Sequence, residues 1–547
     1  MKLDILLTDS LQKIFADEEF SFPEYTAGSA LKCEVFSFQI ACRCDDYADI
    51  EINSDSDLEV ICREVMSVPC EVPAFDSSEN PFVLRNTPGL YPDALMPLQN
   101  SMKVPPRQWK SFWVTIKTKD DTPAGIHNID FKLTAHSTRN SDTDTKECRF
   151  ELEVLPHKLP EQKLIRTEWF HADCIYIKYN TPCWSEKHWE LLEKYFLNCS
   201  SHGINMLLTP LWTPPLDTAI GSERPTVQLL DIKLENGRYS FDFTRLGRWL
   251  DLAVKCKIKY FEISHPFTQW GAEHAPKIVV NVNGKDEKLF GWHTDSTGKE
   301  YTAFLRQLFP VLLAFLEEKG VRKNCFFHVS DEPAESHIPV YSKCASLIEE
   351  LTENGNIIDA LSSFEFYRNK LVKTPIPGNN HLEEFYSAKV SPLWTYYCCA
   401  QKAKVPNRFF NYPSARNRIM GVLLYVYDIA GFLQWGYNFW YSRLSKRVDI
   451  DPFRVTDADR SFPSGDAFAV YPGTEGPIDS IRHEVMYEAL QDLRALRLLE
   501  SRIGREKSLE VIHSGIGHTL TMENYPRSSE WIIELRQRIN SLISVKY

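Results

Sequence analysis

Two neighbouring carboxylic acids follow a short apolar segment in FFHVSDEP (326–333). The paired phenylalanines predict a buried strand, and Asp331 and Glu332 come directly after it. Carboxylates in such a place are unusual unless they are paired, hydrated or used in chemistry. Pro333 cannot donate a hydrogen bond to a neighbouring strand, so the strand has ended before it. Both acids can therefore project from the open end of the strand. The pair can supply an acid, a base or a stabilising charge, and an ordinary strand-end cap or salt bridge explains so short a motif equally well.

Aromatic residues near the ends of other predicted strands point to a carbohydrate ligand. Aromatic rings pack against the apolar faces of sugar rings, while carboxylates supply the acid and base of glycoside hydrolysis. The tryptophans in such positions are Trp212, Trp270, Trp394 and Trp435. A place in the hydrophobic core explains them about as well as a stacking wall does.

Histidines and cysteines give weaker signals. His265 and His328 are more often hydrogen-bonded barrel residues than catalysts. His171 and Asp173 have the spacing of a metal pair, but no second cluster with ligand spacing accompanies them, so we expect no metal and no cofactor. The 14 cysteines include no Cys-x-x-Cys pair, which favours reduced thiols packed as small hydrophobic groups.

Short apolar strands alternate with longer helical segments from about residue 163. The predicted strands lie at 164–174, 204–212, 258–267, 324–333, 357–366, 392–400 and 429–438, with a weaker one at 372–380. Ser185 can cap the first helix, and Gly203, Gly320 and Gly355 follow helix ends. Seven or eight such units fit a (β/α)8 barrel, whose catalytic groups lie at the C-terminal ends of its strands. An open doubly wound sheet is the alternative, but no Gly-x-Gly-x-x-Gly follows the first strand.

The sequence pattern of residues 1–157 predicts an N-terminal antiparallel β-sandwich. Apolar and polar residues alternate in segments such as SFWVTIKT (111–118), a pattern typical of strands with one buried and one wet face. The proline-containing stretch 155–162 shows no such period and is predicted to link the sandwich to the barrel.

The barrel is predicted over 163–450 and a C-terminal extension, with loops and helices packed on the barrel, over 451–547. A helix is predicted at 481–500 from its apolar spacing, and Ser528 can cap a final helix.

The overall composition limits the possible partners. The chain has 547 residues, with 43% hydrophobic and 25% charged residues, which is typical of a folded protein and excludes a largely disordered one. The net charge of −12 argues against nucleic acid as a partner. The apolar runs are too short for a membrane span, and no secretory signal pattern opens the chain, so we expect a cytoplasmic protein. The oligomeric state is left open.

Five long segments are distinctive enough to identify relatives. They are LTPLWTPPLDTAIGSERPTVQLLDI (208–232), HVSDEP (328–333), WTYYCCAQ (394–401), GFLQWGYNFW (431–440) and SGDAFAVYPGTEGPIDSIRHE (464–484). In these segments the chain resembles glycoside hydrolase family 123, the β-N-acetylgalactosaminidases and their uncharacterised relatives. The resemblance covers most of the chain and implies a β-sandwich, a (β/α)8 barrel and a C-terminal extension.

The resemblance also implies an activity. The chain is expected to be a retaining exo-β-N-acetylgalactosaminidase that releases terminal β-GalNAc from oligosaccharides or glycoconjugates. In this substrate-assisted mechanism, the 2-acetamido oxygen attacks the anomeric carbon and forms an oxazolinium ion. Glu332 is expected as the general acid and later the general base, and Asp331 as the group that orients the acetamido N–H. Substrate-assisted enzymes are a recognised exception to the use of two carboxylates.

The resemblance and the strand-end positions together give the remaining expected substrate contacts. Tyr396 is expected to hydrogen-bond the acetamido carbonyl oxygen. The others are His171, Trp212, Glu223, Arg224, His265, Trp270, Trp394, Trp435 and Asn438.

Three alternatives remain open at this point. The first is a β-N-acetylglucosaminidase or other hexosaminidase, because GlcNAc differs from GalNAc at C4 and the sequence does not show which residue recognises that hydroxyl. A non-catalytic sugar-binding barrel would bind without turnover. A two-carboxylate glycosidase would cleave substrates that lack the 2-acetamido group.

Overall fold

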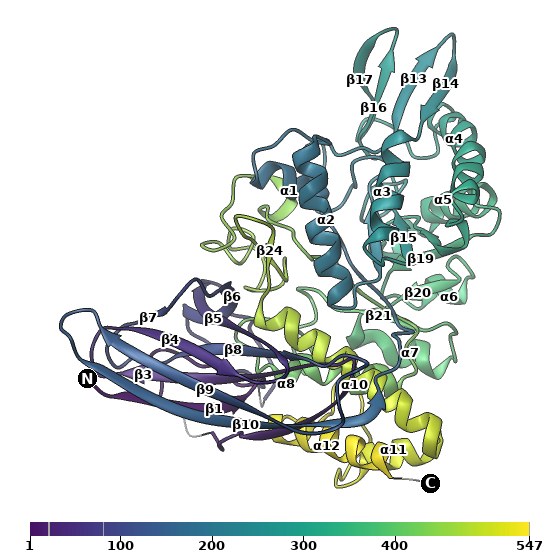
Figure 1. The fold of residues 1–547 in the computed structure, drawn as a ribbon. Coiled ribbons are helices and arrows are strands. Elements are labelled where there is room, and N and C mark those ends of the chain that lie inside the picture. Colours follow the sequence, from purple (N-terminus) through teal and green to yellow (C-terminus); the bar gives the residue numbers. More distant parts are fainter. Residues whose placement is uncertain (20–21, 80, 546–547) are drawn as a thin grey trace.

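The structure is a computed structural model that describes residues 1–19, 22–79 and 81–545. A β-sandwich and a group of C-terminal helices pack together at one end of a parallel barrel, and a small sheet projects beyond the other end (Figure 1). None of the described helices is long and apolar enough to cross a membrane.

Two five-stranded sheets form the sandwich. The first holds β1 (Leu3–Asp9), β3 (Val35–Cys44), β8 (Lys110–Lys117), β5 (Glu59–Cys70) and β6 (Gly89–Pro97), in that order. The second holds β2 (Ala27–Lys32), β10 (Thr143–Lys158), β9 (Gly125–Ser137), β4 (Ala48–Asp55) and β7 (Met102–Val104). Apolar side chains of the two sheets meet between them, as in the stacked rings of Phe38 and Phe150. The predicted antiparallel sheets are confirmed, except that β2 runs parallel to β10 along its edge.

Eight parallel strands form a nearly closed barrel in chain order. They are β11 (Ile165–Glu168), β12 (Met206–Thr209), β15 (Tyr260–Ile263), β18 (Cys325–Phe327), β19 (Asn356–Ala360), β20 (Thr374–Ile376), β21 (Trp394–Tyr396) and β22 (Gly431–Gln434). A single bridge between Gly378 and Tyr396 joins β20 to β21. Each predicted strand segment coincides with one of these strands, including the weak one at 372–380, although β19 begins one residue before its predicted segment.

Helical segments separate the successive barrel strands, although they vary greatly in length. They are α1 (Ala172–Lys178), α2 (Glu186–Ser201), α3 (Thr244–Lys255), α4 (Lys299–Glu318), α5 (Ile338–Leu351), α6 (Glu365–Arg368), α7 (Leu382–Ser387), α8 (Ala415–Arg418) and α9 (Met420–Val426). Short 3-10 turns lie at Arg322–Asn324, Glu335–His337, Asn379–His381 and Arg443–Ser445.

The predicted helix ends agree with the structure at three of four positions. Ser185 accepts a hydrogen bond from the His188 N–H at the start of α2. Gly203 and Gly320 adopt positive φ angles after α2 and α4. The prediction for Gly355 is wrong, because α5 ends earlier and the left-handed residues are Glu353 and Asn354.

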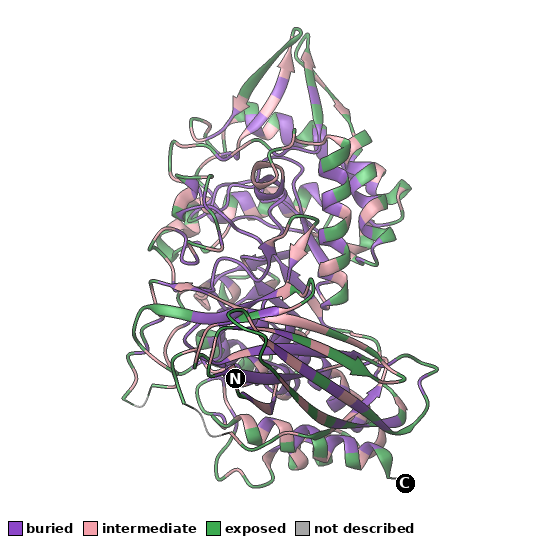
Figure 2. Ribbon diagram, turned by 60° about the vertical axis from the view of Figure 1, so that its left-hand side comes forward, coloured by how far each residue is buried: buried purple, intermediate pink, exposed green. Residues whose placement is uncertain are grey.

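A four-stranded sheet projects from the barrel mouth, and the sequence analysis missed it. Its strands, in the order β14, β13, β16 and β17, are Arg238–Asp242, Asp231–Glu235, Ile278–Val282 and Lys285–Phe290. Each of its two hairpins turns at an Asn-Gly pair whose residues have positive φ. The tips of both hairpins are exposed (Figure 2). Asn-Gly between two short alternating segments was the signal that could have predicted them.

The C-terminal segment connects the sandwich to the barrel. It holds β23 (Tyr471–Pro472), β24 (Pro477–Ile478), α10 (Ile481–Ile503), α11 (Arg505–His513) and α12 (Ser529–Ser544). The predicted cap at Ser528 is confirmed by its bond from Trp531 N–H. The Gln491 side chain of α10 bonds both backbone polar groups of Val35 in the sandwich, at 2.8 and 2.9 Å. One hydrophobic core is continuous through all three parts, so we keep the division at 157/163 and 450/451 as a proposal.

Candidate active site

Asp331 and Glu332 lie on the loop after β18, at the C-terminal end of the barrel strands. The Asp331 carbonyl accepts a hydrogen bond of 2.7 Å from the Trp270 N–H, and the Glu332 N–H donates to the Ala360 carbonyl at 3.0 Å. Glu332 has a φ of +43°, a conformation that a non-glycine residue adopts only where its surroundings fix it. Contacts from β19 and from the loop after β15 therefore position both acids.

The two acids differ in their surroundings. Asp331 is half-buried, whereas Glu332 is exposed to the barrel mouth. Burial, followed by the adjacent Glu332 carboxylate, raises the pKa of Asp331 well above its usual range, although the charge of His328 acts in the opposite direction. The protonated form of Asp331 is therefore favoured, and Glu332 remains accessible to a ligand.

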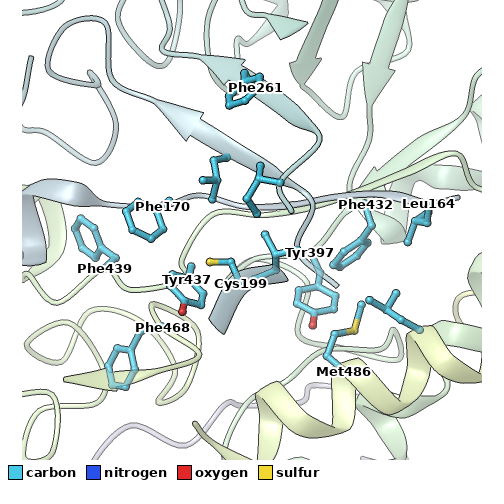
Figure 3. Packing of buried hydrophobic residues seen from close by; sticks show 14 of the residues in the cluster. Leu164, Phe170, Cys199, Phe261, Tyr397, Phe432, Tyr437, Phe439, Phe468 and Met486 are labelled. Atoms are coloured by element: carbon cyan, nitrogen blue, oxygen red, sulfur yellow. The ribbon is translucent and has the colours of Figure 1, made fainter. Parts of the chain in front are cut away.

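Tyr396 connects β21 to the acidic pair. Its hydroxyl donates to Glu332 Oε1 at 2.6 Å, and its side chain is only 5% exposed. Burial and the Glu332 charge raise its pKa well above 10, so the hydroxyl keeps its proton and remains a donor. The next residue, Tyr397, packs outside the barrel towards Met486 of α10, as Figure 3 shows. The opposite directions follow from the alternation of side chains along a strand.

A buried charged triad lies within the barrel. The two ring nitrogens of His328 contact Asp359 Oδ1 at 3.1 Å and Glu262 Oε1 at 2.6 Å. Burial alone would lower the His328 pKa, but the two carboxylates outweigh it and raise the pKa to about 9. The imidazolium is therefore charged at neutral pH and compensates two buried acids. Trp169 also donates to Glu262, at 2.7 Å.

His265 stacks on this triad without a polar partner of its own. Its ring lies 3.9 Å from that of His328, centroid to centroid, and meets the Trp169 ring edge-on. Among the described residues, neither of its ring nitrogens has a hydrogen-bond partner. Burial and the His328 charge lower the His265 pKa well below 6.5, so a neutral imidazole is available to a ligand hydroxyl. Trp212 donates to the His265 carbonyl at 2.8 Å from the surrounding core.

Trp270 is the exposed aromatic residue of the site. It is 40% exposed, although it directly contacts the backbone of Asp331. An exposed indole on a residue whose backbone bonds that of Asp331 is suited to stacking against the apolar face of a sugar ring.

A second polar group lies around His171 at the end of β11. Arg224 binds both carboxylate oxygens of Asp173, at 2.9 and 3.0 Å, and donates to His171 Nδ1 at 3.1 Å. His171 Nε2 then donates to the Trp435 carbonyl at 3.0 Å. Asn438 holds the His171 backbone with two further bonds, of 2.8 and 3.1 Å. The four predicted contacts in this group, His171, Arg224, Trp435 and Asn438, are thus linked by hydrogen bonds that meet at His171.

Asp466 is bonded to this group through Trp435. The Trp435 indole donates to Asp466 Oδ2 at 2.9 Å. Burial raises the Asp466 pKa to about 7. The charges of both Glu332 and Asp466 contribute to raising the pKa of the Cys398 thiol well above its usual range.

Two predicted contacts lie apart from these groups. Glu223 is on the surface, where it pairs with Lys277 at 2.8 Å and with Lys288, and these bonds lower its pKa to about 2. Trp394 is buried inside the barrel at the first residue of β21, against Gly431. Among the described residues, neither Glu223 nor Trp394 has a hydrogen bond or ion pair with Asp331 or Glu332.

Four polar residues of the site were not predicted: Glu262, Asp359, Ser362 and Asp466. Glu262 and Asp359 are acids inside the apolar strand segments YFEI and NIIDA, and a charge in a buried strand was a usable signal. Ser362 Oγ lies 3.5 Å from the Tyr396 hydroxyl. Asp466 falls within the segment SGDAF, which the sequence analysis used only for the resemblance.

One group of ligand-type atoms lies inside the barrel. Atoms of His265, His328 and Asp359 are within 4.8 Å of one another. Both nitrogens of His328 are already bonded to carboxylates, which leaves His265 as the group with free capacity. Taken together, the side chains of the site can donate and accept protons at Asp331 and Glu332, and Trp270 can stack against a ring.

Comparisons with known proteins agree with this arrangement. The family model for the glycoside hydrolase 123 catalytic domain matches residues 169–499, more than half of the chain. A family 123 glycoside hydrolase from Clostridium perfringens, described in work on glycolipid glycan hydrolysis, has the same fold: the TM-score is 0.76 at 15% identity, over 99% of this chain and 98% of that one.

Two other solved structures are less similar. A Parabacteroides merdae β-glucuronidase has a TM-score of 0.32 at 11% identity, over 89% of this chain and 51% of its own. A family 5 mannosidase from Rhizomucor miehei has a TM-score of 0.32 at 12% identity, over 60% and 93%. Both similarities are too weak to carry an inference. No curated protein sequence matches the chain.

The match covers the barrel from β12 to β22, both acids, the His171 group and most of α10. The chain therefore belongs to glycoside hydrolase family 123 and is a glycoside hydrolase.

Proposed function

We propose that this enzyme is a retaining exo-β-N-acetylgalactosaminidase that works through an oxazolinium intermediate. The adjacency of Asp331 and Glu332 carries the proposal. A retaining glycosidase with its own nucleophile places two carboxyl groups about 5 Å apart across the anomeric carbon. Two consecutive residues held on one loop favour an acid and a substrate-orienting group instead, with the nucleophile supplied by the sugar.

The first step breaks the glycosidic bond. The carbonyl oxygen of the 2-acetamido group attacks the anomeric carbon and forms the oxazolinium ring. The electron pair of the breaking bond goes to the leaving oxygen, which takes the proton of Glu332. The exposure of Glu332 to the mouth supports this role, because the acid must reach an oxygen of the departing group.

The second step reverses the proton transfer. Water attacks the anomeric carbon, Glu332 accepts its proton, and the bond to the acetamido oxygen breaks to restore the amide. Two inversions at one carbon give overall retention of configuration. Glu332 therefore alternates between acid and base, as microscopic reversibility requires.

Asp331 and Tyr396 prepare the substrate's nucleophile. The Asp331 carboxylate would accept the acetamido N–H and stabilise the positive charge that develops on the ring. Tyr396 would donate to the acetamido oxygen, and its raised pKa keeps that donor protonated. A proton on Asp331 in the free enzyme must leave before it can act as an acceptor, so substrate binding and deprotonation are coupled.

The remaining contacts fit a sugar bound at the barrel mouth. We propose that Trp270 stacks on the ring and that His265 binds a hydroxyl through a free ring nitrogen. His171, Arg224, Trp435 and Asn438 are proposed to support the wall of the same pocket. We propose Trp212, Glu223 and Trp394 only as indirect contributors, since their structural partners lie elsewhere.

The preference for GalNAc rests on the family resemblance, and glycolipid glycans are proposed as a substrate class because the Clostridium perfringens relative is described in that context. We also propose that the barrel is of the (β/α)8 type, with α6 and α8 as reduced helices.

Matched aryl β-glycosides of GalNAc, GlcNAc, galactose and glucose test the proposal. We expect turnover of the GalNAc glycoside, with a loss of about 10²- to 10⁴-fold in Glu332→Gln. Glu335→Gln is the matched control, since this acid follows on the same connection, is exposed, and its carboxylate accepts a bond from Ser363 on the surface. Equal cleavage of the galactoside would contradict substrate assistance, and equal cleavage of the GlcNAc glycoside would contradict the GalNAc preference.

A further inference from the structure

Two histidines and two carboxylates meet where the sandwich, the barrel and the C-terminal helices join. His202 ends α2, Asp479 precedes α10, and His483 lies in its first turn. One ligand-type atom from each of these three residues lies within 4.8 Å of the others. Because α2 leads into the N-terminal end of β12, the cluster is at the opposite end of the barrel from Asp331.

Hydrogen bonds fix which nitrogen of His202 faces the cluster. Its Nδ1 lies 3.0 Å from the Asn198 carbonyl, which can only accept, so Nδ1 carries the proton. Nε2 then faces Asp479 Oδ1 at 3.8 Å and Glu484 Oε1 at 3.6 Å. A histidine that binds a metal through one nitrogen usually donates its other N–H to a carbonyl or carboxylate in this way.

The carboxylates are also held in place by second partners. Asp479 accepts from the Asn198 amide at 2.6 Å and from Arg63 at 2.7 Å. Arg63 of β5 also bonds Glu484. Outer hydrogen bonds of this kind orient metal-binding carboxylates, and here one of them comes from the sandwich.

His483 is the residue that these interactions do not explain. It is 1% exposed, and neither of its ring nitrogens has a partner among the described residues. Its ring lies 4.1 Å from that of His202. A buried polar atom without a partner is unfavourable, and a cation bound at one of these nitrogens would give the side chain a partner.

We propose that His202, Asp479 and His483, with Glu484 as fourth ligand, bind one Zn²⁺ ion that ties α2 to α10. Zinc prefers tetrahedral nitrogen and oxygen ligands at about 2.0–2.2 Å, which puts neighbouring ligand atoms about 3.4 Å apart. The separations of 3.6 and 3.8 Å around His202 Nε2 come within a few tenths of an ångström of this spacing. The ligands come from positions about 280 residues apart, so the sequence spacing gives no sign of the site.

Metal titration of the full chain, without an affinity tag and after dialysis against a chelator, tests the proposal. We expect one Zn²⁺ per chain by elemental analysis, a rise in melting temperature with Zn²⁺, and the visible absorption of tetrahedral Co²⁺ when cobalt replaces it. His202→Asn and His483→Asn should each weaken binding about 100-fold. His513→Asn, which removes a histidine of α11 outside the cluster, should leave binding unchanged.

Two results would overturn the site. One is wild-type protein that binds less than one-tenth of an equivalent of either metal. The other is stoichiometric binding that both cluster variants retain. If a variant fails to fold, the wild-type cobalt spectrum still decides, because an octahedral spectrum excludes this ligand set in the proposed geometry.

Discussion

The hydrogen bond from Tyr396 to Glu332 offers a direct test of the site geometry. Tyr396→Phe removes one oxygen from a buried ring and leaves the rest of the side chain in place. In the structure the hydroxyl donates to the Glu332 carboxylate at 2.6 Å, and in the proposed complex the same hydroxyl turns to the acetamido oxygen, so the variant lacks a donor in both states. Hydrogen bonds to charged groups contribute about 1.5–3 kcal/mol, and each 1.4 kcal/mol corresponds to a tenfold change in rate. We therefore expect kcat/KM to fall by about 10- to 150-fold.

The neighbouring Tyr397 provides a matched control. It is also buried, and its hydroxyl donates to Asn417 Oδ1 at 3.1 Å, on the other side of the strand from Glu332. Tyr397→Phe therefore loses a neutral hydrogen bond outside the barrel, and kcat/KM should stay within about threefold of wild type.

The assay is steady-state hydrolysis of an aryl β-GalNAc glycoside by both variants, with circular dichroism to confirm folding. If Tyr396 acts mainly in the transition state, kcat falls while KM changes little. Activity of Tyr396→Phe within twofold of wild type would refute the assigned role, and so would equal losses in the two variants.

Three further predictions concern the triad, the sugar platform and the barrel core. The pKa of His328 is about 9 in the folded protein, above its ordinary 6.5. Its ionisation should therefore add about 3 kcal/mol to the free energy of unfolding below about pH 6.5, and this contribution is lost as the pH rises through 9. Urea unfolding of wild type and His328→Gln at about pH 6 and pH 10 measures the loss. Trp270→Ala should raise KM roughly 2- to 10-fold in the glycoside assay with little change in kcat, because it removes an exposed stacking ring. Gly431→Ala should destabilise the protein by about 1–3 kcal/mol in thermal unfolding, since a new Cβ would overlap the Trp394 ring.

Each of these predictions has a control or a contradicting result. A stability difference between wild type and His328→Gln that does not change with pH would contradict the charged triad. An unchanged KM in Trp270→Ala would exclude stacking at that ring. Gly89→Ala is the control for Gly431→Ala, because a Cβ there meets no atom within 4 Å.

The barrel was predictable because its signals are local. Each strand is a short apolar run, and helix caps such as Ser185 and Gly203 mark the boundaries between units. Asp331 and Glu332 could be singled out for the same reason, since two charges directly after a buried strand are visible in the sequence alone.

The polar networks were not predictable, because they depend on contacts across the barrel. His328 bonds Glu262 and Asp359, which are 66 and 31 positions away. Strand position alone also did not distinguish the two ends of β21: Trp394 begins the strand and packs against Gly431, whereas Tyr396 ends it and reaches Glu332. The surroundings of each side chain depend on whether it lies at the first or the last residue of this three-residue strand. The alternation of apolar and polar residues does not show that position.

The central claim is that the sugar's own acetamido group is the nucleophile. The most direct test is the rate of hydrolysis of aryl β-galactosaminides whose N-acyl group carries zero, one, two or three fluorine atoms. Fluorine withdraws electrons from the carbonyl oxygen and weakens it as a nucleophile without changing the leaving group. Our account predicts that kcat falls at every step, by roughly tenfold or more across the series, which corresponds to at least about 1.4 kcal/mol in the barrier. A rate that does not depend on the number of fluorine atoms would contradict it.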